Sequence, residues 1–257
     1  MMKRKLALMF FVLVLVVFAP VISIVSAGKS DRTPPTLEKH VFIHHKRGPA
    51  RPPWAGGGGG KPEEDGQYKL LGKGVEWKTT PVTYVIDPDN NYGLSKEFVV
   101  AAIFAAAEEW DANTQEELFG DTYTIDHNSS WDDESPDGRN ELLFGDYPQA
   151  GVIAVTIIWG YFSGPVGLRE IIEFDILFDT DYTWGYAGET SETELGNTEV
   201  MDLQNIATHE LGHGVGLADL YDSSASEETM YGYSAYGETW KRTVYTGDIA
   251  GIKDLYG

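Results

Sequence analysis

The sequence predicts a single folded domain over residues 67–257 that combines strands with three helices, of the α/β or α+β class. Helix signals cover residues 96–112, 203–215 and 248–255, and runs of β-branched and aromatic residues lie outside them. The 42% hydrophobic and 12% aromatic composition is that of a globular protein. A chain of 257 residues has room for one such domain and additional segments.

The first half of this domain contains one predicted helix and three predicted strands. Ser95 is a suitable N-cap for the helix of residues 96–112, in which Val99, Ile103 and Trp110 recur at helical spacing. The strands are predicted at residues 81–87, 141–144 and 152–159. The last of these runs is almost entirely apolar, which is typical of a buried strand.

The second half adds one strand and two helices. Residues 171–178 alternate between apolar and acidic side chains, which predicts a strand with one covered face. The apolar face holds Ile172, Phe174, Ile176 and Phe178, and the other face holds Glu173 and Asp175. The helix of residues 203–215 starts near Asp202, and the helix of residues 248–255 is expected to be capped by Thr246 and ended by Gly257.

The N-terminal residues 1–27 predict a secretory signal peptide. Lys3, Arg4 and Lys5 precede an apolar run over residues 6–19 that is short for crossing a bilayer. Residues 25–27 then resemble a signal-peptidase site. Cleavage there predicts a secreted, extracellular protein, whereas an uncleaved segment would anchor the chain in a membrane.

Residues 28–66 are basic and rich in proline and glycine, and we expect them to lack folded structure. The glycine run of residues 56–60 is typical of a flexible linker. The basic part before it is interpreted either as a pro-segment that docks on an acidic domain or as a surface tether. A further hypothesis is that His40, His44 or His45 reaches a metal as a temporary ligand.

The formal net charge of −21 is distributed unevenly. Three basic residues before residue 28, and seven basic and two acidic residues over 28–61, leave a net charge of −29 on residues 62–257. Such an acidic domain is expected to repel nucleic acid and anionic membranes and to favour cationic substrates. The chain contains no cysteine, so neither a disulfide nor a thiol can brace or block a site.

The segment of residues 209–219 carries the chemistry. His209 and His213 are four residues apart and therefore lie on one face of a helix, where two imidazoles can share a metal ion. Glu210 places a carboxylate beside the open side of that metal. Gly216 can adopt a positive φ that ends the helix, after which Asp219 can return as a third ligand. The alternative is two surface histidines on an ordinary helix.

This pattern resembles the metzincin zinc proteases, whose signature is H-E-x-x-H-x-x-G-x-x-H/D followed by a methionine turn. Residues 228–233 around Met230 look like that turn. Within the metzincins the sequence is most similar to the matrixins, through residues 175–184, 201–208 and 246–257. The resemblance implies an α+β catalytic domain with a twisted mixed sheet and three main helices.

Two departures from the matrixin pattern matter. Matrixins usually have a histidine where this chain has Asp219, and an aspartate there resembles the snapalysins; Asp222 is a nearby competitor for the role. Matrixins also carry histidines for a structural zinc, whereas His127 is the only spare histidine here, so a second zinc is not expected. Tyr233 is one position late for the oxyanion role of a metzincin tyrosine, which favours packing.

The resemblance implies a monomeric zinc metalloendopeptidase with a polypeptide substrate. Zinc would be held by His209, His213 and Asp219, and Glu210 would act as the general base toward a zinc-activated water. The substrate would lie extended along an edge strand, for which residues 152–159 are the candidate. Acidic clusters could bind a structural calcium ion, with solvated loops as the alternative. These clusters are Asp132, Asp133 and Glu134 with Asp137, and Asp179 with Asp181.

Two other functions compete with this prediction. One is a secreted, non-catalytic module that binds peptides or glycans and retains a vestigial metal site, because 7 tryptophans and 14 tyrosines could line a binding surface. The other is a zinc hydrolase that acts on a non-peptide bond. Chelator-sensitive digestion of a peptide would separate all three. A purely structural zinc is disfavoured, since such sites use four protein ligands.

Overall fold

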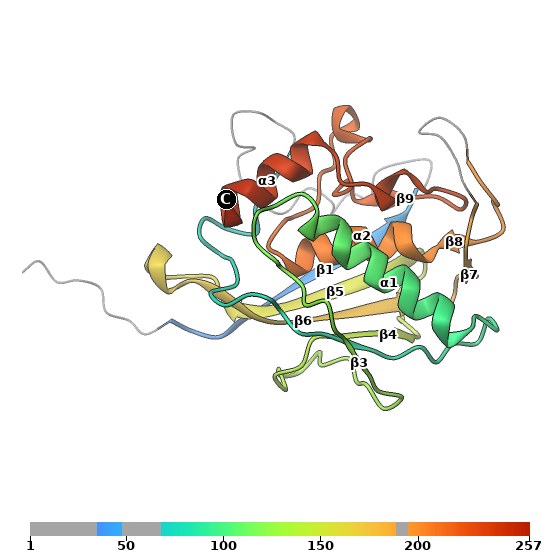
Figure 1. Ribbon diagram of the computed structural model, residues 1–257, viewed down its shortest axis with the longest axis horizontal. Helices are drawn as coiled ribbons and strands as arrows, with labels where there is room; N and C mark the ends of the chain where they lie inside the picture. Colours follow the sequence, from blue (N-terminus) through green and yellow to red (C-terminus); the bar gives the residue numbers. More distant parts are fainter. Residues whose placement is uncertain (1–34, 48–67, 189–194) are drawn as a thin grey trace, which may run out of the picture. The chain divides into compact units, whose positions relative to one another are not determined.

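The computed structural model describes residues 35–47, 68–188 and 195–257 (Figure 1). The expected signal peptide and the glycine run lie outside these ranges. Residues 34–257 form one compact unit. Among the described ranges, every helix is too short or too polar to cross a bilayer.

Nine strands and three α-helices occur in the described part of the chain. The strands are β1 (Glu38–Lys46), β2 (Val85–Ile86), β3 (Thr124–Ile125), β4 (Glu141–Gly145), β5 (Val152–Tyr161), β6 (Glu170–Asp179), β7 (Trp184–Gly185), β8 (Met201–Asp202) and β9 (Tyr233–Ser234). The α-helices are α1 (Lys96–Asp111), α2 (Leu203–Gly214) and α3 (Thr246–Tyr256). Short 3-10 helices cover Val166–Leu168, Ser223–Ala225 and Trp240–Arg242.

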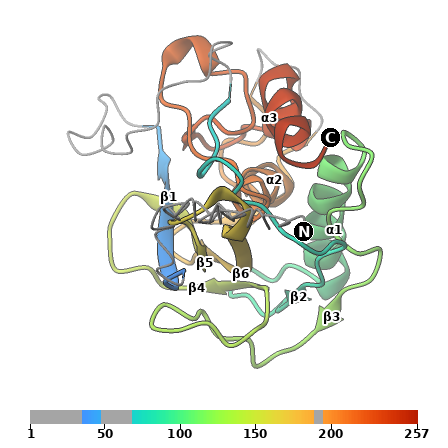
Figure 2. The same ribbon diagram turned by 90° about the vertical axis from the view of Figure 1, so that its left-hand side faces the viewer.

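The main sheet has seven strands in the order β3-β2-β4-β6-β5-β1-β9. β3, β2, β4 and β6 are parallel, β5 is antiparallel to both of its neighbours, and β9 runs parallel to β1. The three helices lie on one side of this sheet (Figure 2). A twisted mixed sheet with three helices confirms the predicted α+β class.

β1 corrects the expectation that residues 28–66 lack folded structure. Residues 38–46 pair with β5 from Glu38 opposite Gly160 to His45 opposite Val152. The short apolar run within this basic segment supplies a strand-forming sequence, and β5 offers unpaired backbone groups along its outer edge. The predicted edge strand, residues 152–159, is therefore a strand whose outer edge β1 occupies.

β6 is covered on both faces rather than on one. Glu173 and Asp175 are buried because residues 131–138 lie over them, and the backbone N–H groups of Asp132 and Asp137 donate to Asp175 and Glu173 at 3.4 and 3.2 Å. The pairing of β5 with β6 also shifts register next to Gly160, so Ile171 rather than Ile172 reaches the core.

The helices begin largely where the sequence predicts. The Ser95 hydroxyl accepts from the Phe98 N–H at 3.2 Å, and the Asp202 carboxylate caps α2. Trp110 of α1 is fully buried and donates from Nε1 to the Thr208 carbonyl at 2.9 Å, which joins α1 to α2. The expected Thr246 cap is wrong, because α3 already includes this residue.

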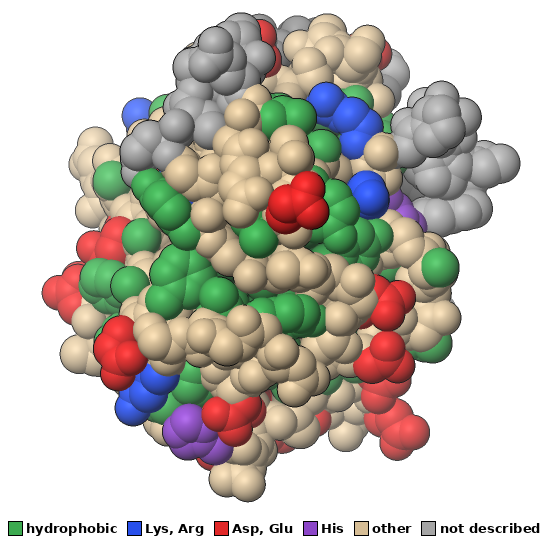
Figure 3. Space-filling model, turned by 90° about the vertical axis from the view of Figure 1, so that its right-hand side faces the viewer, with side chains coloured by type: hydrophobic (Ala, Val, Ile, Leu, Met, Phe, Trp, Pro, Cys, Tyr) green, Lys and Arg blue, Asp and Glu red, His purple; other side chains and the backbone are tan. Residues whose placement is uncertain are grey.

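The strand predicted at residues 81–87 is shorter than expected. Only Val85–Ile86 pair as β2, and Val82 makes an isolated bridge to Phe119. The neighbouring strand β3 has two residues, so it offers no longer partner. On the face shown in Figure 3, hydrophobic side chains form a band across the middle, and most acidic side chains lie toward the edges.

Candidate metal centre

Helix α2 presents His209, Glu210 and His213 toward the sheet, with all three side chains fully buried. His209 Nδ1 lies 2.6 Å from the Thr229 carbonyl, and His213 Nδ1 lies 2.9 Å from the Leu217 carbonyl. A carbonyl can only accept, so each Nδ1 carries the hydrogen. Each Nε2 of a neutral ring is then left with a free lone pair, the form in which imidazole binds a metal.

The chain turns back after α2 at Gly216, whose φ is 106°. A Cβ at this position would come within 2.9 Å of the Val75 carbonyl oxygen, so the turn needs glycine for both reasons. Asp219 Oδ1 then lies 3.3 Å from His209 Nε2 and 3.5 Å from His213 Nε2. The structure thus brings together the three residues predicted as metal ligands.

These three atoms have no hydrogen-bond partner among the described residues, although all are buried. Burying a polar atom without a partner costs about 1–3 kcal/mol, so three of them facing one point require an explanation. Two imidazole nitrogens and a carboxylate oxygen are a ligand set that suits zinc. The donor set therefore fits a zinc ion and leaves room for a fourth ligand.

Burial and mutual charge set the ionisation of this group. Burial lowers the pKa of His209 to about 4. Burial opposes ionisation of Asp219, but the adjacent His213 and His209 outweigh it and hold the pKa of this carboxyl well below its usual range. Burial opposes protonation of His213, but Asp219 outweighs it and raises the pKa of this imidazole. A metal ion would take the place of that proton between the two side chains, because it binds neutral imidazole and ionised carboxylate.

Met230 lies beneath this group, as the predicted methionine turn requires. Its sulfur would be 2.3 Å from a Cβ at position 212, so Gly212 lets α2 rest directly on it. The buried Asp248 of α3 accepts from the N–H groups of Thr229 and Met230 and fixes the turn. The Thr229 carbonyl, in turn, orients His209.

Glu210 is held from two sides. Thr156 of β5 donates from Oγ1 to its Oε2 at 2.5 Å, and His44 Nδ1 of β1 lies 3.0 Å from its Oε1. Burial raises the pKa of Glu210, which makes it a better proton acceptor than an exposed carboxylate.

β1 crosses directly over the centre. The Phe42 ring stacks on His213 with a centroid distance of 3.9 Å and an interplanar angle of 6°, and the His44 ring lies 4.0 Å from that of His209. Among the three histidines considered as temporary ligands, His44 contacts Glu210 and His209, whereas the exposed His40 lies against Phe162.

Two residues of the site carry no signal in the sequence pattern. Thr156 looks like an ordinary strand residue, and Tyr221 like a loop residue two positions after Asp219. The Tyr221 hydroxyl donates to Asp219 Oδ2 at 2.9 Å and leaves Oδ1 facing the histidines. Asp222, the competing ligand, is exposed and caps the 3-10 helix Ser223–Ala225. Tyr233 packs against Tyr231, in agreement with the packing role expected for it.

A second group of carboxylates lies on the opposite side of the sheet. Asp132 comes together with the buried Glu173 and Asp175, and also with Asp137 and Glu141. Burial raises the pKa of Asp175 to about 8. Asp132 and Asp137 belong to the clusters predicted to bind calcium. The alternation along residues 171–178 predicts an open face for Glu173 and Asp175, and their burial makes that prediction wrong.

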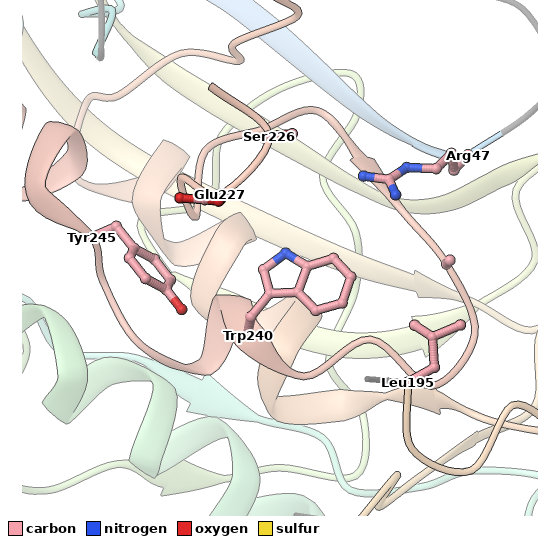
Figure 4. A pocket seen from close by; sticks show the side chains of 7 residues that line it. Arg47, Leu195, Ser226, Glu227, Trp240 and Tyr245 are labelled. Carbon is pink, nitrogen blue, oxygen red and sulfur yellow. The ribbon is translucent and has the colours of Figure 1, made fainter. Parts of the chain in front are cut away.

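A separate hollow of about 500 Å³ lies beyond the end of β1 (Figure 4). Arg47, Glu227, Trp240 and Tyr245 are among its lining residues. It contains none of the residues that surround Glu210, so it is not the metal centre. Arg47 directly follows the last residue of β1, so the hollow lies next to the end of this strand.

The C-terminal part of the chain, which contains this geometry, is similar to known metalloproteinases. Residues 160–257 match the model of the matrixin family of M10 peptidases. The chain is 32% identical over 123 residues to metalloendoproteinase 5-MMP of Arabidopsis thaliana, covering 41% of this chain and 32% of that protein.

Two further relatives match shorter stretches. Metalloendoproteinase 2-MMP of Arabidopsis thaliana is 35% identical over 79 residues, and metalloendoproteinase 1 of Glycine max is 36% identical over 80 residues. Each match covers 31% of this chain, with 20% and 24% of the relatives respectively. The matched part thus spans a third or less of these relatives' length. The fold, the residues around Met230 and these matches together are similar to those of the matrixins.

Proposed function

We propose that this protein is a zinc metalloendopeptidase, with zinc held by His209, His213 and Asp219. The observation that carries the proposal is the convergence of three buried atoms that lack hydrogen-bond partners among the described residues, with Glu210 beside them. The metalloendoproteinase names of the relatives support the same reaction.

Hydrolysis needs groups that transfer a proton, orient the base and bind the substrate, and different residues of the chain supply them. Bound zinc would supply a Lewis acid that lowers the pKa of water and polarises a carbonyl. Glu210 accepts the proton of the attacking water and passes it to the leaving amine. Thr156 keeps the Glu210 carboxylate oriented during both transfers, since its hydroxyl is fixed on β5. A substrate would bind extended along β5, through the same backbone groups that β1 uses.

The segment of residues 28–66 acts in this proposal as an inhibitory pro-segment. β1 fills the β5 edge that a substrate needs, and Phe42 covers His213. The basic side chains of β1 also hold it in place: Lys39 lies over the Trp159 ring and Lys46 over the Tyr236 ring, at 5.5 and 4.6 Å from the centroids. Removal of β1 would open the groove.

Secretion is the second part of the proposal. Its support is the basic, apolar and small-residue pattern of residues 1–27. The N-terminal sequence of the protein recovered from culture medium tests it. A start at residue 28 or later is expected, and recovery of an intact residue 1 in the membrane fraction would contradict it.

The third part of the proposal is a structural calcium ion bound by Asp132, Glu173 and Asp175. The supporting observations are the proximity of three carboxylates and an Asp132 oxygen without a hydrogen-bond partner among the described residues. Oxygen ligands of this kind suit calcium, which would offset the burial of their charge.

Digestion of peptides tests the activity itself. The full chain, loaded with zinc, is expected to cleave casein or a peptide library slowly and in a chelator-sensitive manner, through the fraction of molecules in which β1 is displaced. The Glu210→Gln variant should retain zinc and lose at least a hundredfold in rate, because the amide cannot accept the proton. Equal rates for the two proteins at equal zinc content would contradict the assignment and favour the binding-module alternative.

A further inference from the structure

We propose that the pocket now filled by His44 selects peptide substrates with a polar, hydrogen-bonding side chain, histidine above all, next to the cleaved bond. The pocket is formed by His209, Glu210, Ser234, Glu238 and Lys241, and is called the His44 pocket below. This inference rests on the proposed peptidase function, and it adds the class of substrate.

β1 occupies the groove as an extended peptide would. It pairs with β5 on one side, and on the other side His45 and Lys46 pair with Tyr233 and Ser234 of β9. Two residues apart on a strand, Phe42 and His44 point the same way, toward α2. A side chain beside the general base belongs to a residue that flanks the bond under attack. His44 therefore marks such a position in the bound peptide.

The far end of the His44 pocket is polar. His44 Nε2 lies 3.0 Å from Ser234 Oγ, and this hydroxyl donates to Glu238 Oε1 at 3.0 Å. Lys241 Nζ donates to Ser234 Oγ at 2.9 Å, to the Tyr233 carbonyl at 2.9 Å and to Glu238. Glu238, Lys241 and Ser234 are all fully buried, so this ion pair and hydroxyl are part of the interior.

The hydrogen bonds already made by Ser234 determine which side chain fits the His44 pocket. The Ser234 hydroxyl has one hydrogen, which goes to Glu238, and two lone pairs, one of which accepts from Lys241. The remaining lone pair faces the His44 ring, so Nε2 is the donor in this contact. The pocket thus offers an acceptor to a side chain that brings an N–H group to its end. Imidazole fits, and a carboxamide can make the same bond.

An apolar side chain in the same position would fill the space and leave the Ser234 lone pair without a partner and without water. Such a loss costs about 1–3 kcal/mol, which corresponds to roughly five- to a hundredfold in specificity. Sites built around a substrate hydrogen bond discriminate strongly against analogues that lack it.

The test uses matched peptides with the full chain. Three peptides carry the sequence of residues 35–47 with His, Gln or Leu at position 44, and compete in one digest with wild type, Ser234→Ala and Ser223→Ala. Ser223 is an exposed serine outside the groove and serves as the matched control. Because β1 blocks the groove equally for all peptides, the ratios of kcat/KM do not depend on its occupancy.

Wild type and Ser223→Ala should prefer His over Leu by at least fivefold, with Gln between them, and Ser234→Ala should reduce this preference at least threefold. A His:Leu ratio within twofold of one in wild type, or an unchanged ratio in Ser234→Ala, would overturn the proposal. Melting curves exclude misfolding of the variant.

A binding arm separates this proposal from the peptidase function. Fluorescence anisotropy of the labelled peptides on the full-length Glu210→Gln chain reports the same preference without cleavage. Preferential binding of the His peptide without any cleavage by wild type would support the proposed specificity of the His44 pocket and contradict the peptidase function. Cleavage together with binding that does not prefer the His peptide would support the peptidase function and contradict the proposed specificity of the pocket.

Discussion

Replacement of His44 by alanine should activate the full-length protein. His44 makes two buried hydrogen bonds of 3.0 Å, one to the ionisable Glu210 and one to Ser234, and its ring lies 4.0 Å from that of His209. Because Nε2 of the neutral His44 ring carries the hydrogen, Nδ1 accepts from a protonated Glu210, and each of these neutral hydrogen bonds contributes about 0.5–1.5 kcal/mol. The truncation should therefore weaken the docking of β1 by about 1–3 kcal/mol, or roughly five- to a hundredfold.

The initial rate of cleavage of a quenched peptide measures this directly. While β1 fills the groove in most molecules, the rate is proportional to the fraction in which it is displaced, so the rate should rise by the same factor until most grooves are open. His40→Ala is the matched control, because His40 is an exposed residue of the same strand and contacts Phe162 instead of the centre. A His44→Ala protein that is folded and carries zinc, yet cleaves no faster than wild type and His40→Ala, would refute the inhibitory role.

Two further predictions concern charge. Asp219→His should shift the acidic limb of the activity–pH profile to lower pH, because a neutral ligand leaves the zinc more positive and the water easier to ionise; an unchanged limb in an active variant would count against Asp219 as a ligand. Burial raises the pKa of Asp175 from the ordinary value of 3.8 to about 8, so the folded state holds this proton more tightly than the unfolded state. The resulting stability is fully present below about pH 4 and is lost as the pH rises through about 8. The Tm of the calcium-free chain should fall between pH 5 and 8 and recover with calcium at pH 8, and Asp175→Asn should flatten the decline; a Tm independent of pH and calcium would contradict both roles.

The grouping of His209, His213 and Asp219 could be predicted from the sequence because it depends on local geometry. His209 and His213 share a helix face by virtue of their spacing, and Gly216 permits the turn that returns Asp219. Each contact spans few residues, so the pattern alone contains the arrangement. The three helices and most strands can be predicted from the sequence for the same reason, since periodicity and capping are local properties.

Local sequence patterns do not specify contacts between distant segments of the chain. Nothing in residues 38–46 specifies which strand they pair with, and His44 lies 166 residues from Glu210. Thr156 is one of several polar or small residues on β5, and only the packing of α2 on the sheet turns it toward Glu210. The burial of Asp175 likewise depends on residues 131–138 folding over β6, which alternation cannot reveal.

The coordination of zinc tests the central claim most directly. Zinc-edge X-ray absorption of the full chain and of Asp219→Ala, with metal content measured in parallel, reports the number and kind of bound atoms. We predict one zinc per chain with two imidazole nitrogens and at least one carboxylate oxygen from Asp219, and weaker binding with loss of that oxygen in the variant. An identical spectrum and affinity in Asp219→Ala, or a shell without two imidazoles, would contradict the proposed centre.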